Sequence, residues 1–437
     1  MGKFTKDTLI TFITRVFQLI IGFGIYVIIA RVLGPEKNGI YSLAVLLPAF
    51  LIIFTDFGLT SSIVFYIGKK KYSLKEIFGT SIILSILISI FAVLIGLIVI
   101  SFFGNKVFPG VGKEYLFLVL SLIPFKFFLA LVVNILLGIQ KIEKYNFIQL
   151  FNTVIFLLLT IVLLLGFHFM IKAAVLAELL SLFVACIVLF FVIKKEVGGL
   201  IFSFNKLLAR DLFSFGCKSY FSSIGNFLHL KIDMWMINVF LNPLAVGFYS
   251  VAVILSEKIQ IIPQSVGTVL FPKVASEEDG KVLKEFTPLI CRNILFITLF
   301  VILIIFILSY WIIVMFYSNA YLDSLLSLRI LLIGTIGLGG YTVLTYDLAG
   351  RGKPMVNTYI AVASLILNII LNIIFIPKFG IVGAALATAI SYNVAFLIKV
   401  FFYSKISGNR VRDILFVKKS DFQFYRNFFI LLKGKIT

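Results

Sequence analysis

Basic side chains inside apolar runs are the residues of this sequence whose type and placement could do chemistry. Five of them are candidates for binding a substrate: Arg15, Lys126, Lys218, Lys231 and Arg329. A cation near the centre of a bilayer costs about 2.5–3.5 kcal/mol on insertion scales, so it usually faces a watery cavity or a partner. Cations spread over the depth of a membrane would suit an anionic headgroup that must cross it. Phosphate or pyrophosphate is the obvious candidate.

Two of these lysines lie deep in their apolar runs. Lys126 follows Pro124 near the middle of its run, which holds no acid to neutralise it, and snorkelling from about ten residues deep is hard. Lys231 is followed two residues later by Asp233, but at about 100° per residue the two point to nearly opposite sides of a helix. Arg15 and Lys399 lie closer to the ends of their runs, where snorkelling to water is the alternative to lining a cavity.

Acids within the apolar runs have three readings, which are proton or sodium coupling, pairing with the cations, and a carboxylate at a helix end in contact with water. Asp233 and Glu257 are the candidates for ion coupling. Asp56 and Asp347 lie near the ends of runs, where contact with water would remove most of the cost of burial. For the remaining acid, Glu178, all three readings stay open.

Metal, redox and nucleotide chemistry have no signature here. The chain has 2 histidines, and its 3 cysteines, Cys186, Cys217 and Cys291, form no CxxC pair. No GxxxxGK[ST] sequence is present, so direct use of ATP is not expected. We therefore expect no cofactor, no metal site and no enzyme activity.

Apolar stretches of about 20 residues, enough to cross a bilayer, must position these charges. With 61% hydrophobic and 13% charged residues among 437, the chain is predicted to be an all-α integral membrane protein. Twelve spans are predicted: Leu9–Ala30, Ile40–Thr60, Phe78–Phe103, Tyr115–Leu137, Asn146–Phe167, Ala173–Ile193, Leu212–Leu241, Ala245–Phe271, Asn293–Phe316, Leu325–Ala349, Asn357–Ile376 and Ile381–Tyr403.

The net charge of +20 is distributed unevenly between the predicted loops. Of the 39 Lys and Arg residues, 26 fall in the termini and in alternate loops that would share one side of the membrane. The positive-inside rule makes that side cytoplasmic and places both termini inside a cell membrane. The excess charge thus orients the protein and requires no nucleic acid as a partner.

The sequence also repeats itself. Residues 33–47 (LGPEKNGIYSLAVLL) match residues 241–255 (LNPLAVGFYSVAVIL) at eight of fifteen positions, and residues 171–181 match 381–391 at nearly the same offset. This indicates two six-helix lobes, residues 1–193 and 212–403, related by a pseudo-two-fold axis along the membrane normal. The segment 194–211 would be a cytoplasmic interfacial linker between them, and 404–437 a cytoplasmic tail.

Five segments in this order resemble the polysaccharide biosynthesis family of lipid-linked oligosaccharide flippases: ARVLGPEKNGIYSLA (30–44), DFGLTSS (56–62), LHLKIDMWMINVFL (228–241), VGFYSVA (246–252) and IPKFGIVGAALATAIS (376–391). The resemblance implies the fold of a superfamily that also contains the lipid II flippases and the multidrug and toxic-compound extrusion transporters. It implies a cargo of undecaprenyl-pyrophosphate-linked glycan, moved to the outer leaflet by alternating access. It also implies cations in a central cavity, for which Arg15, Lys126, Lys218 and Lys231 are the matching positions.

Other functions stay open at this point. One is a cation-coupled multidrug exporter of the same superfamily, which would need acids facing its substrate. Another is a membrane-embedded polysaccharide polymerase or acyltransferase, which would usually carry its catalytic residues on a large outer loop; the longest predicted outer loop is 104–114. For a flippase, the expected partners are the lipid-linked glycan, the bilayer, a coupling ion (H+ or Na+), and the polysaccharide polymerase and glycosyltransferases.

Overall fold

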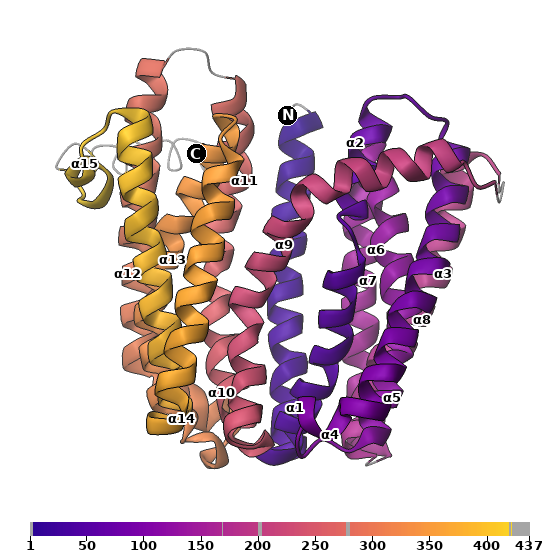
Figure 1. Cartoon of the computed structure of the whole chain (residues 1–437), viewed down its shortest axis with the longest axis horizontal. Helices are drawn as coiled ribbons and strands as arrows, with labels where there is room; N and C mark the ends of the chain where they lie inside the picture. The colour runs from indigo at the N-terminus through magenta and orange to yellow at the C-terminus, as the bar shows by residue number, and fades with distance from the viewer. Residues whose placement is uncertain (1–2, 168, 200–202, 277–279, 419–420, 422–437) are drawn as a thin grey trace, which may run out of the picture. The chain divides into compact units, whose positions relative to one another are not determined.

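The computed structural model describes residues 3–167, 169–199, 203–276, 280–418 and 421. Every regular element in these ranges is helical (Figure 1). The chain divides into two compact units, residues 1–251 with 313–322, and residues 252–312 with 323–437. Each unit is described separately below.

The first unit contains α1 to α9 and most of α10. Their bounds are α1 Lys3–Thr55, α2 Leu59–Gly68, α3 Leu74–Ile98, α4 Gly104–Val107, α5 Lys113–Leu120, α6 Leu122–Gly138, α7 Ile142–Ile161, α8 Met170–Val197, α9 Lys206–Phe240 and α10 Pro243–Glu257. Short π-helical turns, Val99–Phe103 and Val162–Gly166, extend α3 and α7. The segment 313–322 adds the turns Ile313–Tyr317 and Asn319–Tyr321.

The second unit contains the rest of the chain. Its helices are the end of α10, the 3-10 turn Lys258–Gln260, α11 Ile261–Ser276, α12 Gly280–Ile312, α13 Ser324–Gly350, α14 Pro354–Ser407 and α15 Val411–Leu415. A buried apolar cluster, to which α11, α12, α13, α14 and α15 all contribute, forms its core around Cys291, Val343, Leu344 and Tyr403.

Two helices are too long for one crossing of a membrane. Helix α1 has 53 residues and α14 has 54, and each contains one residue with non-helical dihedral angles, Gly34 (φ 72°) and Gly380 (φ 60°). Positive φ is accessible to glycine without steric cost, and Pro35 and Pro377 lie beside these breaks and lack a backbone N–H. The breaks lie between the first and second and between the eleventh and twelfth predicted spans.

Nine helical segments of the described chain are long and apolar enough to cross a membrane: Ile10–Thr55, Leu74–Val107, Lys113–Gly138, Ile142–Gly166, Met170–Val197, Pro243–Phe271, Leu283–Tyr317, Ser324–Gly350 and Pro354–Ser407. Helix α9 is absent from this set although its 35 residues are long enough. Its lysines, arginine and aspartates lower its apolar character. The structure therefore supports an all-helical membrane fold without by itself giving the number of crossings.

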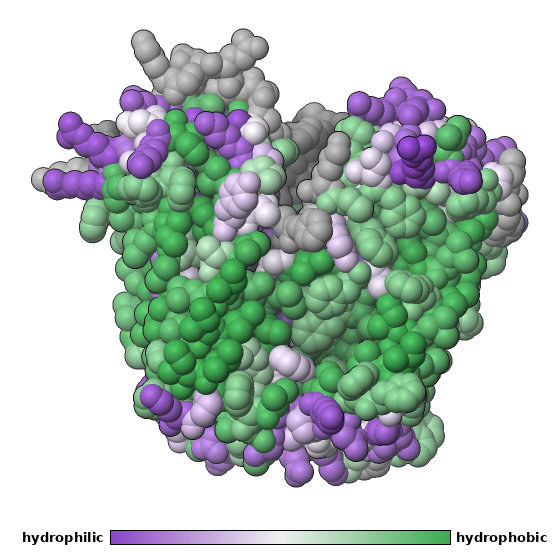
Figure 2. All heavy atoms as spheres, in the orientation of Figure 1, coloured by the Kyte–Doolittle hydropathy of each residue, from purple (hydrophilic) through white to green (hydrophobic). Residues whose placement is uncertain are grey.

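The outer faces of the long helices suit a lipid environment. On α3, the large apolar side chains Ile86, Leu87, Ile90, Phe91 and Leu94 are each more than half exposed. The opposite face of α3 buries small residues, which allow close helix packing. Figure 2 shows apolar residues along the middle of the helices and hydrophilic residues at their ends, as expected for a protein surrounded by hydrocarbon.

The first turns of α9 are fastened to α2 and α3 (Figure 1). Lys71 and Tyr72 both donate hydrogen bonds of 2.6 Å to Asp211. Further along, the ring of Phe215 stacks on Phe65 with 3.9 Å between centroids. The backbones meet where a Cβ on Gly216 would lie 2.3 Å from the carbonyl oxygen of Phe57. Residues 206–211, which the sequence analysis places in a linker, are thus the first turns of a continuous helix.

The Asp211 contact should depend on pH. Hydrogen bonds from Lys71 and then from Tyr72 hold the pKa of the Asp211 carboxyl below its ordinary value of 3.8. A carboxyl whose pKa is lowered by folding stabilises the folded state above its unfolded pKa, and this stabilisation is lost as the pH falls through the folded pKa. We expect the contact to persist from neutral pH to about 3.8 and to loosen below it.

Hydrogen exchange over residues 206–216 measures this effect. Asp211→Asn should speed exchange at pH 7, and the wild type should approach the variant only in acid. Equal exchange in both proteins at pH 7 would show that the contact does not hold α9.

Candidate functional site

Lys126, the deepest cation expected from the sequence, lies in the first turns of α6 and has an acidic partner. Its Nζ is 2.7 Å from Oε1 of Glu178 on α8, and the two side chains are 27% and 18% exposed. The pairing reading left open for Glu178 is therefore confirmed. Lys126 has no acid in its own span, as the sequence indicates, but it is neutralised by an acid from another helix.

The break between α5 and α6 sets the position of Lys126. Helix α5 ends at Leu120, and α6 begins two residues later at Leu122. Pro124 has no N–H to donate to the carbonyl of residue 120, which is why the helical ladder is interrupted here. Lys126 lies two residues after Pro124, within α6, and its side chain contacts Glu178 of α8.

The other predicted cations of the first unit are Arg15, Lys218 and Lys231. Arg15 is an exposed residue of α1 and makes no hydrogen bond or ion pair with the part of the chain that the structure describes. Lys231 is half-buried on α9. The side chain of Lys218 lies outside the described residues. The convergence of Lys126, Arg15 and Lys231 on one cavity stays a prediction.

Asp233, one of the two predicted coupling residues, is held by a tyrosine. It is 2% exposed, and its carboxylate accepts hydrogen bonds from the Tyr249 hydroxyl and from the backbone N–H of Met234. Tyr249 is the repeat counterpart of Tyr41, which is also buried. Both copies of the repeat thus bury this tyrosine, and the hydroxyl of the second copy binds a carboxylate.

The predicted residues of the second unit have local partners. Arg329 on α13 donates a 3.0 Å hydrogen bond to Ser309 on α12 and lies over the ring of Phe306. Glu257 is half-buried at the end of α10. Their role in binding or coupling stays a prediction.

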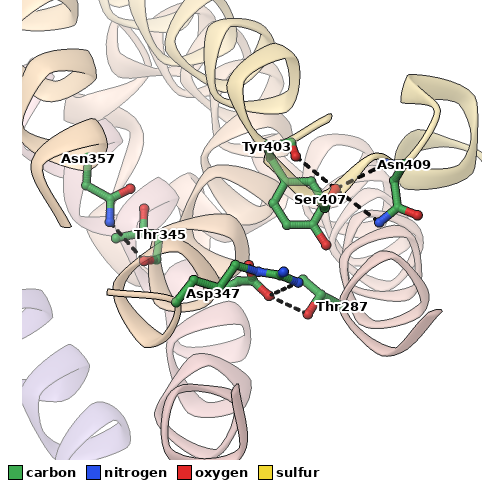
Figure 3. Close-up of polar contacts among 8 residues, drawn as sticks. Thr287, Thr345, Asp347, Asn357, Tyr403, Ser407 and Asn409 are labelled. Atoms are coloured by element: carbon green, nitrogen blue, oxygen red, sulfur yellow. Dashed lines mark hydrogen bonds and ion pairs between the residues drawn. The ribbon is translucent and has the colours of Figure 1, made fainter. Parts of the chain in front are cut away.

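Asp347 differs from the sequence expectation of a carboxylate in contact with water. It is 0% exposed. Figure 3 shows it on α13 with Thr287 of α12, which donates a 2.6 Å hydrogen bond to it, and Arg351 forms an ion pair with it one turn away. The expectation of water contact is wrong because a cation at i+4 replaces water, as this spacing permits on a helix.

The two copies of the sequence repeat touch each other within the first unit. A Cβ on Gly39 would lie 1.8 Å from the carbonyl oxygen of Pro243, and a Cβ on Gly247 would lie 1.8 Å from that of Pro35. Because Pro35 and Pro243 are themselves equivalent positions of the repeat, the contact is reciprocal. Buried Asn38 adds a 3.2 Å hydrogen bond to Ser250.

Sequence reasoning did not identify these contacts. The glycine identities in the repeat were visible, but a shared glycine does not reveal which backbone approaches it. No cluster of three or more His, Cys, Asp or Glu residues able to hold a metal occurs among the described residues. The arrangement offers cations, buried carboxylates and close helix contacts, which are the means to bind and move an ion or an anionic group.

Comparisons with known proteins give the relatives of this chain. The polysaccharide biosynthesis protein family matches residues 4–278. An uncharacterized membrane protein of Methanocaldococcus jannaschii is 36% identical over 155 residues, which is 36% of each chain. A probable low-salt glycan biosynthesis flippase of Haloferax volcanii is 30% identical over 189 residues, 43% of this chain and 40% of that protein. A putative O-antigen transporter of Shigella flexneri is 24% identical over 395 residues, 86% of this chain and 92% of that protein.

Solved structures share the fold. An inward closed conformation of the lipid II flippase MurJ has a TM-score of 0.79 at 20% identity, over 93% of this chain and 89% of that one. An inward-facing multidrug resistance MATE transporter of the MOP superfamily has a TM-score of 0.74 at 18% identity, over 90% of this chain and 94% of that one. These likenesses show a MurJ- and MATE-like helical fold.

The apolar helices, the shared fold and the relatives make this a multi-pass membrane protein. The matched family covers more than half of the chain, from residue 4 to residue 278, and confirms the resemblance seen in the sequence motifs. The chain belongs to the polysaccharide biosynthesis protein family.

Proposed function

We propose that this protein is a flippase that moves an undecaprenyl-pyrophosphate-linked oligosaccharide from the cytoplasmic to the outer leaflet of the cell membrane. The observation that carries the proposal is membership of the polysaccharide biosynthesis family, together with relatives named as a glycan biosynthesis flippase and an O-antigen transporter. In this proposal the transmembrane helices and their buried charges move the substrate, and no covalent bond of the substrate is made or broken.

The proposed architecture is twelve transmembrane helices in two six-helix lobes, with a pseudo-two-fold axis along the membrane normal. Dividing α1 and α14 at Gly34 and Gly380 turns nine candidate segments into eleven, and α9 would supply the twelfth. The reciprocal contact between the repeat copies supports the symmetry. The charge distribution supports cytoplasmic termini.

Lys126 is the proposed anchor for the pyrophosphate. An ammonium has three donors, and its ion pair with Glu178 uses one oxygen at 2.7 Å while 27% of the side chain stays exposed. A phosphate oxygen could therefore share Lys126 or replace Glu178. Arg15, Lys218, Lys231 and Arg329 would receive the headgroup at other depths, while the prenyl chain stays in lipid.

The proposed driving force is electrical, with ion coupling as an addition. An inside-negative potential favours outward movement of an anion by about 2.3 kcal/mol per charge per 100 mV. Proton or sodium exchange at Asp233 or Glu257 would add to it. Glycosyltransferases would supply the cargo and a polysaccharide polymerase would consume it.

A flipping assay tests the proposal. The purified protein in vesicles should move a short-chain polyprenyl pyrophosphate carrying one fluorescent sugar, measured by its loss of protection from a membrane-impermeant quencher. An outward-favouring potential should accelerate this movement. Transport of the cation ethidium, with no movement of the pyrophosphate, would instead identify a drug exporter.

A further inference from the structure

Lys399 is a buried cation that the proposed headgroup pathway does not use. It lies in the second half of α14 and is 0% exposed. The sequence suggested that its amine could snorkel to water, and the structure shows that it does not. A cation removed from water inside a protein normally has an anionic partner or several hydrogen bonds, so its surroundings need an explanation.

Among the described residues, the Lys399 ammonium has one hydrogen-bond partner and one ring contact. Its Nζ lies 3.2 Å from the centroid of the Tyr341 ring. It donates a hydrogen bond to the hydroxyl of Thr345, which in turn donates its own proton to the Tyr341 carbonyl at 2.8 Å. Both partners are on α13. No carboxylate of the described chain forms an ion pair with Lys399, so its charge is held by an aromatic face and one oxygen.

Ion pairs among the described residues of α12, α13 and α14 join other charged groups and do not include Lys399. On α13, Asp347 pairs with Arg351, and the guanidinium of Arg351 lies over the ring of Tyr403 on α14. On α12, Arg292 forms an ion pair with Asp421.

The turn Lys258–Gln260 also packs against α13, through the contact of Gln260 with Thr342. Glu257 and Lys258 adjoin that contact, and both have interactions of their own. Tyr341 is thus the titratable side chain in contact with Lys399.

Two buried amides beside this site have an unused polar atom. Asn357 donates a 2.9 Å hydrogen bond to the Thr345 carbonyl, seen in Figure 3, and its Oδ1 has no partner. Gln260 accepts from Thr342, one turn before Thr345, and its Nε2 has no partner. Buried polar atoms of this kind are satisfied by water. A water molecule bound to either of these atoms would lie beside the turn that contacts Lys399.

We propose that Lys399 is a proton-binding site of the second unit, in which α13 holds the ammonium and its release from α13 delivers the proton to water. A shift of α13 relative to the second half of α14 would move both Tyr341 and Thr345 away from the Lys399 ammonium. An ammonium without partners in an apolar interior gives up its proton rather than staying charged. The N–H bond breaks, its electron pair stays on the nitrogen, and the proton passes to water. The site would couple a proton to the transport cycle proposed above, on which this inference rests.

Proteoliposomes that contain the full chain and an internal pH dye test the coupling. The probe is the fluorescent polyprenyl pyrophosphate of the flipping assay. In the wild type, a gradient of one pH unit should change the final distribution of the probe by up to about tenfold for one coupled proton. Lys399→Gln should flip the probe without this response. Lys399→Arg should also lose it, because arginine keeps its charge but does not release its proton.

Lys405→Gln is the matched control. Lys405 is on the same helix and also lies over an aromatic ring, that of Phe401, but is exposed. It should behave as the wild type. A wild-type gradient response in Lys399→Arg or Lys399→Gln, with unchanged thermal melting, would overturn the proposal.

A second measurement separates this inference from the flippase assignment. Proton titrations of wild type and Lys399→Gln in lipid nanodiscs are compared without any substrate. The number of bound protons is compared between the two proteins at each pH. If this difference changes by one proton between about pH 5 and 9, the proton site is supported, even if no probe is flipped. A difference that stays constant over this range shows a lysine whose charge does not change and rejects the proton site, even if flipping is normal.

Discussion

Glycan export is expected to stop completely and reversibly when residues 38 and 250 are joined by a disulfide. In the structure, Asn38 Nδ2 lies 3.2 Å from Ser250 Oγ, beside the reciprocal backbone contacts of Gly39 and Gly247. The two residues belong to the two copies of the repeat, at the end that the charge distribution predicts to be outside. Alternating access would require these copies to separate, and a covalent link prevents separation.

The experiment uses Asn38→Cys with Ser250→Cys in a chain whose three native cysteines, Cys186, Cys217 and Cys291, are replaced by serine or alanine. Oxidation should abolish flipping of the probe, and reduction should restore it. Asn146→Cys with Thr11→Cys is the control, because these side chains are 2.9 Å apart on α7 and α1, within one predicted lobe. Undiminished flipping by the oxidised 38–250 protein would show that this contact never opens.

Loss of the Lys126 charge is expected to lower flipping by about 10- to 100-fold, the effect of losing one charged hydrogen bond to the headgroup. Lys126→Gln alone also leaves Glu178 without its partner, which could repel an anionic cargo. The double variant Lys126→Gln with Glu178→Gln removes the ion pair as a unit. It should be as defective as the single variant if Lys126 binds pyrophosphate.

The exchanged pair, Lys126→Glu with Glu178→Lys, supplies the contrast. It preserves a possible ion pair while moving the cation to α8. If the pair serves only to hold α6 against α8, the exchanged and the double neutral variants should both flip the probe normally, and the proposed anchor would be wrong. Thermal melting of each variant, with the loss from this partly exposed pair expected to be about 1 kcal/mol or less, separates misfolding from loss of binding.

Much of the fold could be predicted because hydrocarbon imposes a simple pattern. Each crossing needs an apolar run, so the long helices α3, α7, α8, α12 and α13 fall where the apolar runs indicate. Helix ends were less predictable. The second predicted span ends at Thr60, whereas the helix breaks at Asp56 and resumes at Leu59 with Gly58 at φ 71°. A hydrophobic count does not detect a local turn made possible by one glycine.

The candidate site was only partly predictable. The sequence identifies Lys126 as a deep cation and Glu178 as an intramembrane acid, but the 51 residues between them carry no information about their lateral contact. Lys399 shows the opposite case. Distance to the end of an apolar run suggested water contact, yet the packing of Tyr341 and Thr345 buries its amine completely.

The sequence by itself determined that this is a helical membrane protein with a duplicated motif and an excess of cations, because apolar length, repetition and charge are properties of the linear chain. The tertiary structure alone decided which charges pair, which cation is sealed from water, and that Gly39 and Gly247 meet the prolines of the opposite repeat. The physical reason is that these contacts depend on the rotation and lateral position of each helix. Those are set by side-chain packing among neighbours that are distant in the sequence.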